Sequence, residues 1–157
     1  MLLGNLLLAL AWAALQGEFS LATLVTGHVL GYLILLALVR GGVLRASPYI
    51  GRVHRVAGLL TYFLWELVRA NLRLALDVAT PRFQMTPGII AVPLDVTRDS
   101  EILLLSMLIN TTPGSVALDV SDDRRVMYVH VMYMQSPDAA RAEIKDGFER
   151  RVMQLLA

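Results

Sequence analysis

The chain of 157 residues contains no cysteine, and only 17% of its residues are charged. Ordinary soluble domains are about 25% charged. The lack of cysteine excludes a disulfide scaffold, a thiolate metal site and a cysteine nucleophile. The shortage of charge, together with a hydrophobic content of 56% and a mean hydropathy of +0.59, is typical of a membrane protein.

The few charges are distributed unevenly along the chain. Residues 1–75 carry eight charged side chains with a net charge of +4, whereas residues 76–157 carry nineteen with a net charge of −3. The overall charge of +1 gives no indication of nucleic-acid binding. The asymmetry predicts a membrane-embedded N-terminal half followed by one small soluble domain.

Two apolar runs open the sequence. Residues 1–15 contain no charged side chain, and residues 21–39 contain one ionisable group, His28. The second run is long enough to cross a bilayer, while the first is short for a crossing. With a polar break at residues 17–20, they predict a two-helix transmembrane hairpin over residues 1–40. The first run has an alternative reading as a cleaved signal peptide, although it lacks a basic leader segment.

Arginine sets the expected orientation of this hairpin. Arg40, Arg45, Arg52 and Arg55 follow the second apolar run, whereas the break between the two runs carries only Glu18. Because positive residues are retained on the cytoplasmic side, both ends of the hairpin are expected in the cytoplasm.

Small residues recur every four positions in both apolar runs. Such stripes allow helix backbones to approach closely in lipid, so we predict a helix-packing face. Its members are Asn5, Ala9, Ala13, Thr23, Gly27 and Gly31. Ion translocation needs several ionisable groups at bilayer depth, and here there is only His28. His28 is either part of a proton pathway or a neutral imidazole bonded to a neighbouring helix.

A connector rich in glycine leads into a long helical pattern over about residues 53–79, which Pro81 ends. Its charged residues fall on one narrow stripe, a candidate surface for partner contacts. The stripe consists of Arg55, Glu66, Arg69, Arg73 and Asp77. We therefore predict that residues 41–80 form a connector and an amphipathic interfacial helix. The alternative is a third crossing, which would bury these charges and place the following domain outside the cell.

Residues 81–157 have the periodicity of a small α+β domain. They predict a strand at 88–92, a helix capped by Asp99, a hairpin of strands 115–120 and 126–134, and a final helix at 138–156. The order is β-α-β-β-α. Its expected core contains Leu103, Leu118, Val129, Ile144 and Phe148.

The sequence predicts no catalytic, cofactor-binding or metal-binding residues. His130 lies in a strand without a nucleophile at fixed spacing, and Asp119, Asp122 and Asp123 lack the ligand number of a calcium loop. Phosphate-loop and zinc-ligand spacings are absent from the sequence. We therefore expect a protein that is not an enzyme.

Several stretches carry a family resemblance. They are Pro87–Pro93, Asp99–Leu104, Ile109–Gly114, Asp119–Asp123 and Tyr128–His130. In these stretches, and more weakly in the apolar half, the chain resembles the MrpE/MnhE family, the E subunits of the Mrp-type multisubunit sodium/proton antiporters.

The resemblance implies a multi-pass protein of the bacterial cell membrane with a cytoplasmic C-terminal domain. Its partners would be the lipid bilayer and the other subunits of a complex that exchanges cytoplasmic sodium for external protons. The protein would be an accessory component for assembly or stability, with neither cofactor nor catalytic residues. Two other functions stay open: a self-sufficient oligomeric transporter that uses His28, and a membrane-tethered regulatory domain.

The orientation can be tested with single-cysteine variants because the chain has no native cysteine. An impermeant thiol reagent added to intact cells should label Glu18→Cys and leave Asp122→Cys unlabelled. Labelling at position 122 but not at position 18 would reverse the predicted topology.

Overall fold

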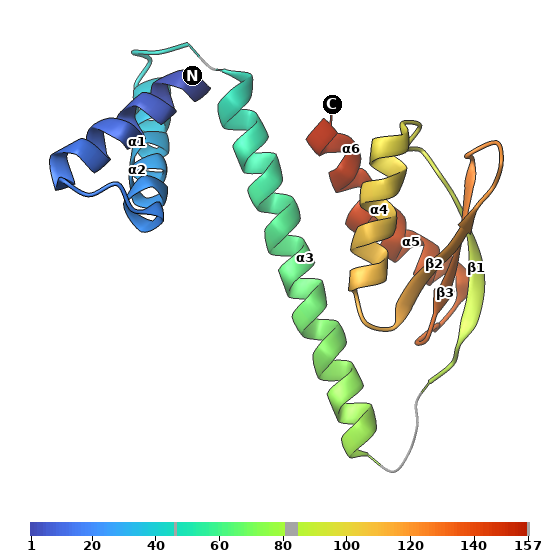
Figure 1. The fold of residues 1–157 in the computed structure, drawn as a ribbon. Helices are drawn as coiled ribbons and strands as arrows, with labels where there is room; N and C mark the ends of the chain where they lie inside the picture. Colours follow the sequence, from blue (N-terminus) through green and yellow to red (C-terminus); the bar gives the residue numbers. More distant parts are fainter. Residues whose placement is uncertain (46, 81–84, 157) are drawn as a thin grey trace. The chain divides into compact units, whose positions relative to one another are not determined.

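The computed structural model describes residues 1–45, 47–80 and 85–156 (Figure 1). The fold is mostly helical and includes a small three-stranded antiparallel sheet. The chain forms two compact units, Met1–His54 and Arg55–Ala157, which meet within one long helix.

The first unit contains α1 (Leu2–Gln16) and α2 (Leu21–Arg40). Gly17 ends α1 in the left-handed conformation with φ of 69°, which glycine adopts without strain. The hydroxyl of Ser20 accepts a hydrogen bond from the Thr23 amide at 3.2 Å and caps α2. Among the described helices, α2 is the one that is long and apolar enough to cross a membrane, and α1 is a shorter apolar helix.

Helix α3 (Pro48–Ala79) begins five residues earlier than the sequence pattern predicted. Pro48 occupies the first helical position, where a missing amide hydrogen loses no bond. The Tyr49 amide donates to the Ser47 hydroxyl at 3.3 Å. The glycine at position 51 is therefore helical, and the expected helix stop at Pro81 lies outside the described residues.

The second unit adds a sheet with helices to the greater part of α3. The strand order is β1-β3-β2, and both pairs are antiparallel. The elements are β1 (Gly88–Pro93), α4 (Asp99–Thr111), β2 (Ser115–Val120), β3 (Val126–Val131), α5 (Pro137–Ala142), η1 (Glu143–Glu149) and α6 (Arg150–Leu156).

Two elements differ in detail from their expected form. The final helix is continuous but contains the π-helical segment η1, which residue periodicity does not distinguish from α-helix because the two differ by about one residue per turn. Asp99 is the first residue of α4 and not its cap. The carboxylate of Glu101 instead accepts from the amides of Thr97 and Arg98, both at 3.1 Å.

The hydrophobic core lies between one face of the sheet and the helices α4 to α6. It includes Ile90, Val92, Ile102, Leu105, Ile109, Met127, Val129, Ile144, Phe148 and Val152. The predicted burial of Val129, Ile144 and Phe148 is confirmed.

The predicted burial of Leu103 and Leu118 is wrong, since these side chains are 57% and 52% exposed. Helix α4 buries the face that carries Leu105, so Leu103 points away from it. In β2 the smaller Ala117 packs against the core, and Leu118 lies at a β-bulge, where the pairing with β3 shifts register between Ala117 and Asp119.

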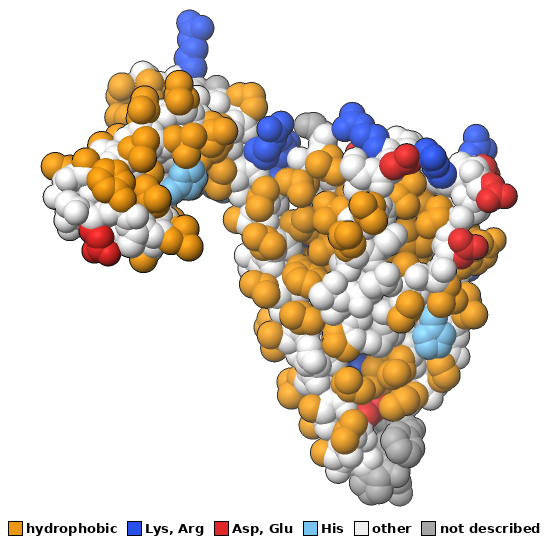
Figure 2. All heavy atoms as spheres, viewed as in Figure 1, with side chains coloured by type: hydrophobic (Ala, Val, Ile, Leu, Met, Phe, Trp, Pro, Cys, Tyr) orange, Lys and Arg blue, Asp and Glu red, His pale blue; other side chains and the backbone are white. Residues whose placement is uncertain are grey.

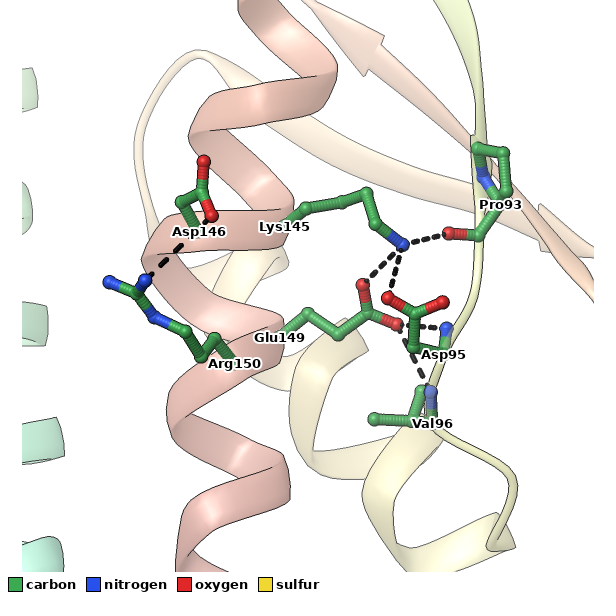
Figure 3. Close-up of polar contacts among 7 residues, drawn as sticks. All are labelled: Pro93, Asp95, Val96, Lys145, Asp146, Glu149 and Arg150. Carbon is green, nitrogen blue, oxygen red and sulfur yellow. Dashed lines mark hydrogen bonds and ion pairs between the residues drawn. The ribbon is translucent and has the colours of Figure 1, made fainter.

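A buried carboxylate joins the final helix to the loop between β1 and α4 (Figure 3). Glu149 is 1% exposed, and its Oε1 accepts from the amides of Asp95 at 2.6 Å and Val96 at 3.1 Å. Lys145 Nζ lies 3.0 Å from Glu149 Oε2 and 2.9 Å from Asp95 Oδ2. Burial lowers the pKa of Lys145, but its hydrogen bonds to Asp95 and Glu149 raise that pKa by more.

Truncation of the core aromatic tests this packing. Phe148→Ala should lower the free energy of unfolding of the domain by about 3–5 kcal/mol, because the cavity left behind is only partly refilled. Leu103→Ala, the matched surface control, should stay within about 0.5 kcal/mol of the parent. Pulse proteolysis of the full chain in mild detergent across a urea series measures both. Equal losses would contradict the assignment of core and surface.

Replacement of Glu149 tests whether its buried carboxylate holds the loop between β1 and α4 in place. Glu149→Gln should cost about 2–4 kcal/mol, because Lys145 and two amides lose a charged acceptor. Asp146→Asn removes an exposed carboxylate from the same helix and should cost under about 1 kcal/mol. Hydrogen exchange at residues 94–98 should rise only in Glu149→Gln. Unchanged hydrogen exchange in Glu149→Gln would show that this carboxylate does not stabilise the loop between β1 and α4.

Candidate functional site

The two apolar helices approach each other at the glycines of α2. A Cβ on Gly27 would lie 2.9 Å from the carbonyl oxygen of Ala9 and 3.0 Å from Trp12 Cβ. A Cβ on Gly31 would collide with the side-chain oxygen of Asn5. The structure therefore brings Gly27 against the backbone of α1 at Ala9, and Gly31 against the side chains of Asn5 and Leu8.

The other small residues of the proposed packing face divide into two groups. Asn5, Ala9 and Ala13 are all buried on α1. Thr23 is only partly buried, and its hydroxyl lies 2.9 Å from that of Ser20 at the start of α2. The close approach is therefore centred on the glycines, one to two helical turns beyond Thr23.

His28 belongs to a polar cluster formed by three helices. The Asn5 amide nitrogen donates to the Tyr49 hydroxyl at 2.7 Å and lies 3.2 Å from His28 Nε2. The Tyr49 hydroxyl also lies 3.2 Å from His28 Nε2. Asn5, His28 and Tyr49 therefore form one polar network that links the three helices.

This cluster contains no carboxylate among the residues that the structure describes. The structure places His28 within hydrogen-bonding distance of side chains from two other helices. Sequence reasoning missed Tyr49 because it placed that residue in a connector. The Pro48 helix start was the available signal, since it puts Tyr49 in the first turn of α3.

The charged stripe of α3 faces the domain of the same unit. Glu66 and Asp77 are buried, with 9% and 6% exposure. Arg69 Nη1 lies 3.3 Å from Glu66 Oε1 and 3.6 Å from Glu143 Oε1. Arg73 lies over the ring of Tyr133, with 5.3 Å between the guanidinium carbon and the ring centroid.

The other three residues of the stripe, Arg55, Arg73 and Asp77, form no ion pair among the described residues. Arg73 and Asp77 form no ion pair with each other among the described residues, because Arg73 is directed to Tyr133. Burial and the nearby Asp77 carboxylate raise the pKa of Tyr133. Arg55 is half-buried, and its Nε has no hydrogen-bond partner within the described part of the chain.

Tyr62 supplies a contact that sequence reasoning missed. Its ring meets Phe148 edge to face at 5.4 Å between centroids, and the Arg151 guanidinium carbon lies 3.8 Å from the centre of the same ring. A Cβ on Gly147 would collide with the Tyr62 hydroxyl, so the absence of a side chain at Gly147 allows this close approach of the ring. Burial raises the pKa of Tyr62, and the nearby Glu66 carboxylate adds to that effect.

A cavity of about 80 Å³ lies between α3 and the turn at residues 112–115. Arg69, Arg73, Tyr133 and Glu143 line its polar side, and core residues line the rest. Its two carboxylates, Glu66 and Glu143, already share Arg69. Three of the charged side chains that line the cavity, Glu66, Arg69 and Glu143, are therefore paired with one another.

The polar groups of the β2–β3 turn stabilise the turn itself. The Asp123 carboxylate accepts from the Ser121 hydroxyl at 2.6 Å and from the Arg125 amide at 3.2 Å, and these bonds lower the pKa of Asp123. His130 lies between Ile89 and Val116 in the sheet register. In residues 1–45, 47–80 and 85–156 no three His, Asp or Glu side chains gather as a metal site.

Comparison with known proteins places the chain among antiporter subunits. A family model described as "Na+/H+ ion antiporter subunit" matches residues 5–155. The chain is 33% identical to the E subunit of the Na(+)/H(+) antiporter of Alkalihalophilus pseudofirmus and 33% identical to that of Bacillus subtilis. Each match covers 96% of this chain and 94% of the relative.

Two solved structures are similar. A chain of the Mrp complex from Dietzia sp. DQ12-45-1b is 27% identical, with a TM-score of 0.50 over 66% of this chain and 96% of that one. A chain of the membrane-bound sulfane sulfur reductase, an archaeal respiratory membrane complex, is 25% identical, with a TM-score of 0.56 over 96% of this chain and 95% of that one. The resemblance noted in the sequence is confirmed, and the chain belongs to the family of E subunits of multisubunit sodium/proton antiporters.

Proposed function

We propose that the chain is an accessory subunit of a multisubunit sodium/proton antiporter, needed for assembly or stability of the complex and not itself conducting ions. The observation that carries this proposal is the close packing of α2 on α1, in which Gly27 meets the backbone of Ala9 and Gly31 meets the side chains of Asn5 and Leu8. Lipid offers no hydrophobic drive for helix association, so such close contact is the main source of attraction between membrane helices. A helix pair built in this way presents a defined surface to companion subunits.

The proposed membrane arrangement is a hairpin at residues 1–40, a connector with an interfacial helix at 41–80 and a cytoplasmic domain at 81–157. The length and apolar composition of α2 and the arginines that follow it support this multi-pass topology in the bacterial cell membrane. Hydrophobic side chains cover the outside of the hairpin (Figure 2), among them Leu3 and Leu7 of α1 and Val29 and Leu33 of α2. These side chains would contact lipid and the membrane helices of the other subunits.

A transporter role for His28 receives less support. A proton pathway needs acidic or basic groups that exchange protons with one another. Asn5 and Tyr49 surround His28 instead, and an amide does not accept a proton at ordinary pH. The cavity beside α3 is the one observation that favours a regulatory domain, but its carboxylates are already bound by Arg69.

Two sets of variants test the accessory role. Gly27→Leu/Gly31→Leu should still insert into the membrane but should fail to enter the complex, because the added side chains occupy the space of Ala9 and Asn5. Sodium/proton exchange in vesicles should fall in proportion to the loss of assembled complex. His28→Ala should retain most of the activity.

The matched control is Gly4→Leu, since a Cβ at Gly4 meets nothing within 4 Å. This variant should assemble and transport as the parent does. Full assembly with lost transport in His28→Ala would contradict the accessory role and revive a direct part in proton transfer. Proton flux on a sodium pulse in proteoliposomes that contain this chain alone would contradict it as well.

A further inference from the structure

Helix α3 presents a broad apolar face to the outside of its unit. The exposed large side chains on it are Leu60, Leu64, Trp65, Val68, Leu72, Leu76 and Val78. At 100° per residue they cover an arc of about 160°. Charged residues are absent from that arc, because those of residues 55–79 all lie on the stripe. Figure 2 shows hydrophobic side chains along the length of α3.

The opposite face of α3 is already occupied by the domain. Tyr62 contacts Phe148 and Arg151, and Arg69 bridges to Glu143. The stripe was expected to be a surface for partners, but its contacts here are intramolecular. The apolar face is therefore the side of α3 that is free to bind something else.

We propose that this apolar face lies in the cytoplasmic leaflet of the bilayer, with α3 parallel to the membrane plane and the domain on its cytoplasmic side. The proposal rests on the membrane topology given under the proposed function. It excludes α3 as a third crossing, because a crossing would carry the domain's Glu143 and Arg151 into the hydrocarbon together with the stripe. Charged groups are strongly disfavoured at that depth.

Two features identify phospholipid as the occupant. Helix α3 follows directly after α2, the one candidate span among the described helices, with residues 41–47 between them. The sequence from Phe19 to Trp65 contains four arginines and no Asp or Glu. Three of these arginines, at positions 40, 45 and 52, are exposed near the start of α3. This charge complements the anionic headgroups of a cytoplasmic leaflet.

Spin labels on the full chain in nanodiscs test the proposal. Leu64→Cys, Val68→Cys and Leu72→Cys should be accessible to oxygen and shielded from a water-soluble nickel reagent, all at the same depth below the phosphates. Asp146→Cys, an exposed domain position, should be accessible to nickel. In a crossing helix, depth would change by about 12 Å between positions 64 and 72.

Such a depth gradient would overturn the proposal. Nickel access at all three positions in the chain alone, with shielding only in the assembled complex, would overturn it in favour of another protein of the complex as occupant. Either result leaves the accessory role intact, since that role is measured by assembly and exchange. The double variant Arg45→Gln/Arg52→Gln should weaken the binding of α3 to nanodiscs rich in phosphatidylglycerol. The ratio of spin label that is shielded by the bilayer to spin label that is exposed to water should fall by about fivefold per arginine. The same variant should have no effect in phosphatidylcholine nanodiscs.

Discussion

The contact between the charged stripe of α3 and the final helical segment determines which face of α3 the domain covers. Gly147 lets that segment come against Tyr62, and Arg69 then reaches both Glu66 and Glu143. Buried carboxylates are tolerated only with such partners. Because Glu66, Arg69 and Arg73 of the stripe make contacts within the unit, the broad uncharged face of α3 is the one that stays exposed, and that face is apolar. The distribution of charge around α3 thus decides which side faces the domain.

The packing of α1 against α2 depends on close contact and hydrogen bonding between the two helices. Inside a bilayer, apolar side chains gain little by meeting one another, so contact at backbone distance has to provide the attraction. Gly27 permits that contact with the backbone of Ala9, and Gly31 leaves room for the side chain of Asn5. The amide of Asn5 would be costly to bury without partners, and His28 with the tyrosine of α3 supplies hydrogen-bond partners for it. Packing and polar bonding are therefore concentrated at the same level of the hairpin.

Strands and helices with a clear hydrophobic periodicity could be predicted from the sequence. The contacts between residues far apart in the sequence could not. The alternation of β3 and the helical spacing of α4 placed both elements correctly. Leu118 was assigned to the wrong face because a strand with apolar residues on both faces does not indicate which one is covered. In the sequence, Glu149 follows Lys145 by four positions, a spacing that is typical of an ion pair on the surface of a helix. Only the fold shows that the amides of the β1–α4 loop converge on its carboxylate.

Several charged side chains of the second unit are paired with one another, and this pairing supports the proposed accessory role. A group that passes ions must release one partner to take another, so at least one site has to remain unsatisfied at each step. In the described stripe, Glu66 is held by Arg69, and in the final helix Glu149 is held by Lys145 and two amides. Their ion pairs bind one part of the chain to another. Such bonds hold the domain and α3 together, which agrees with the proposal that companion subunits carry out the ion exchange.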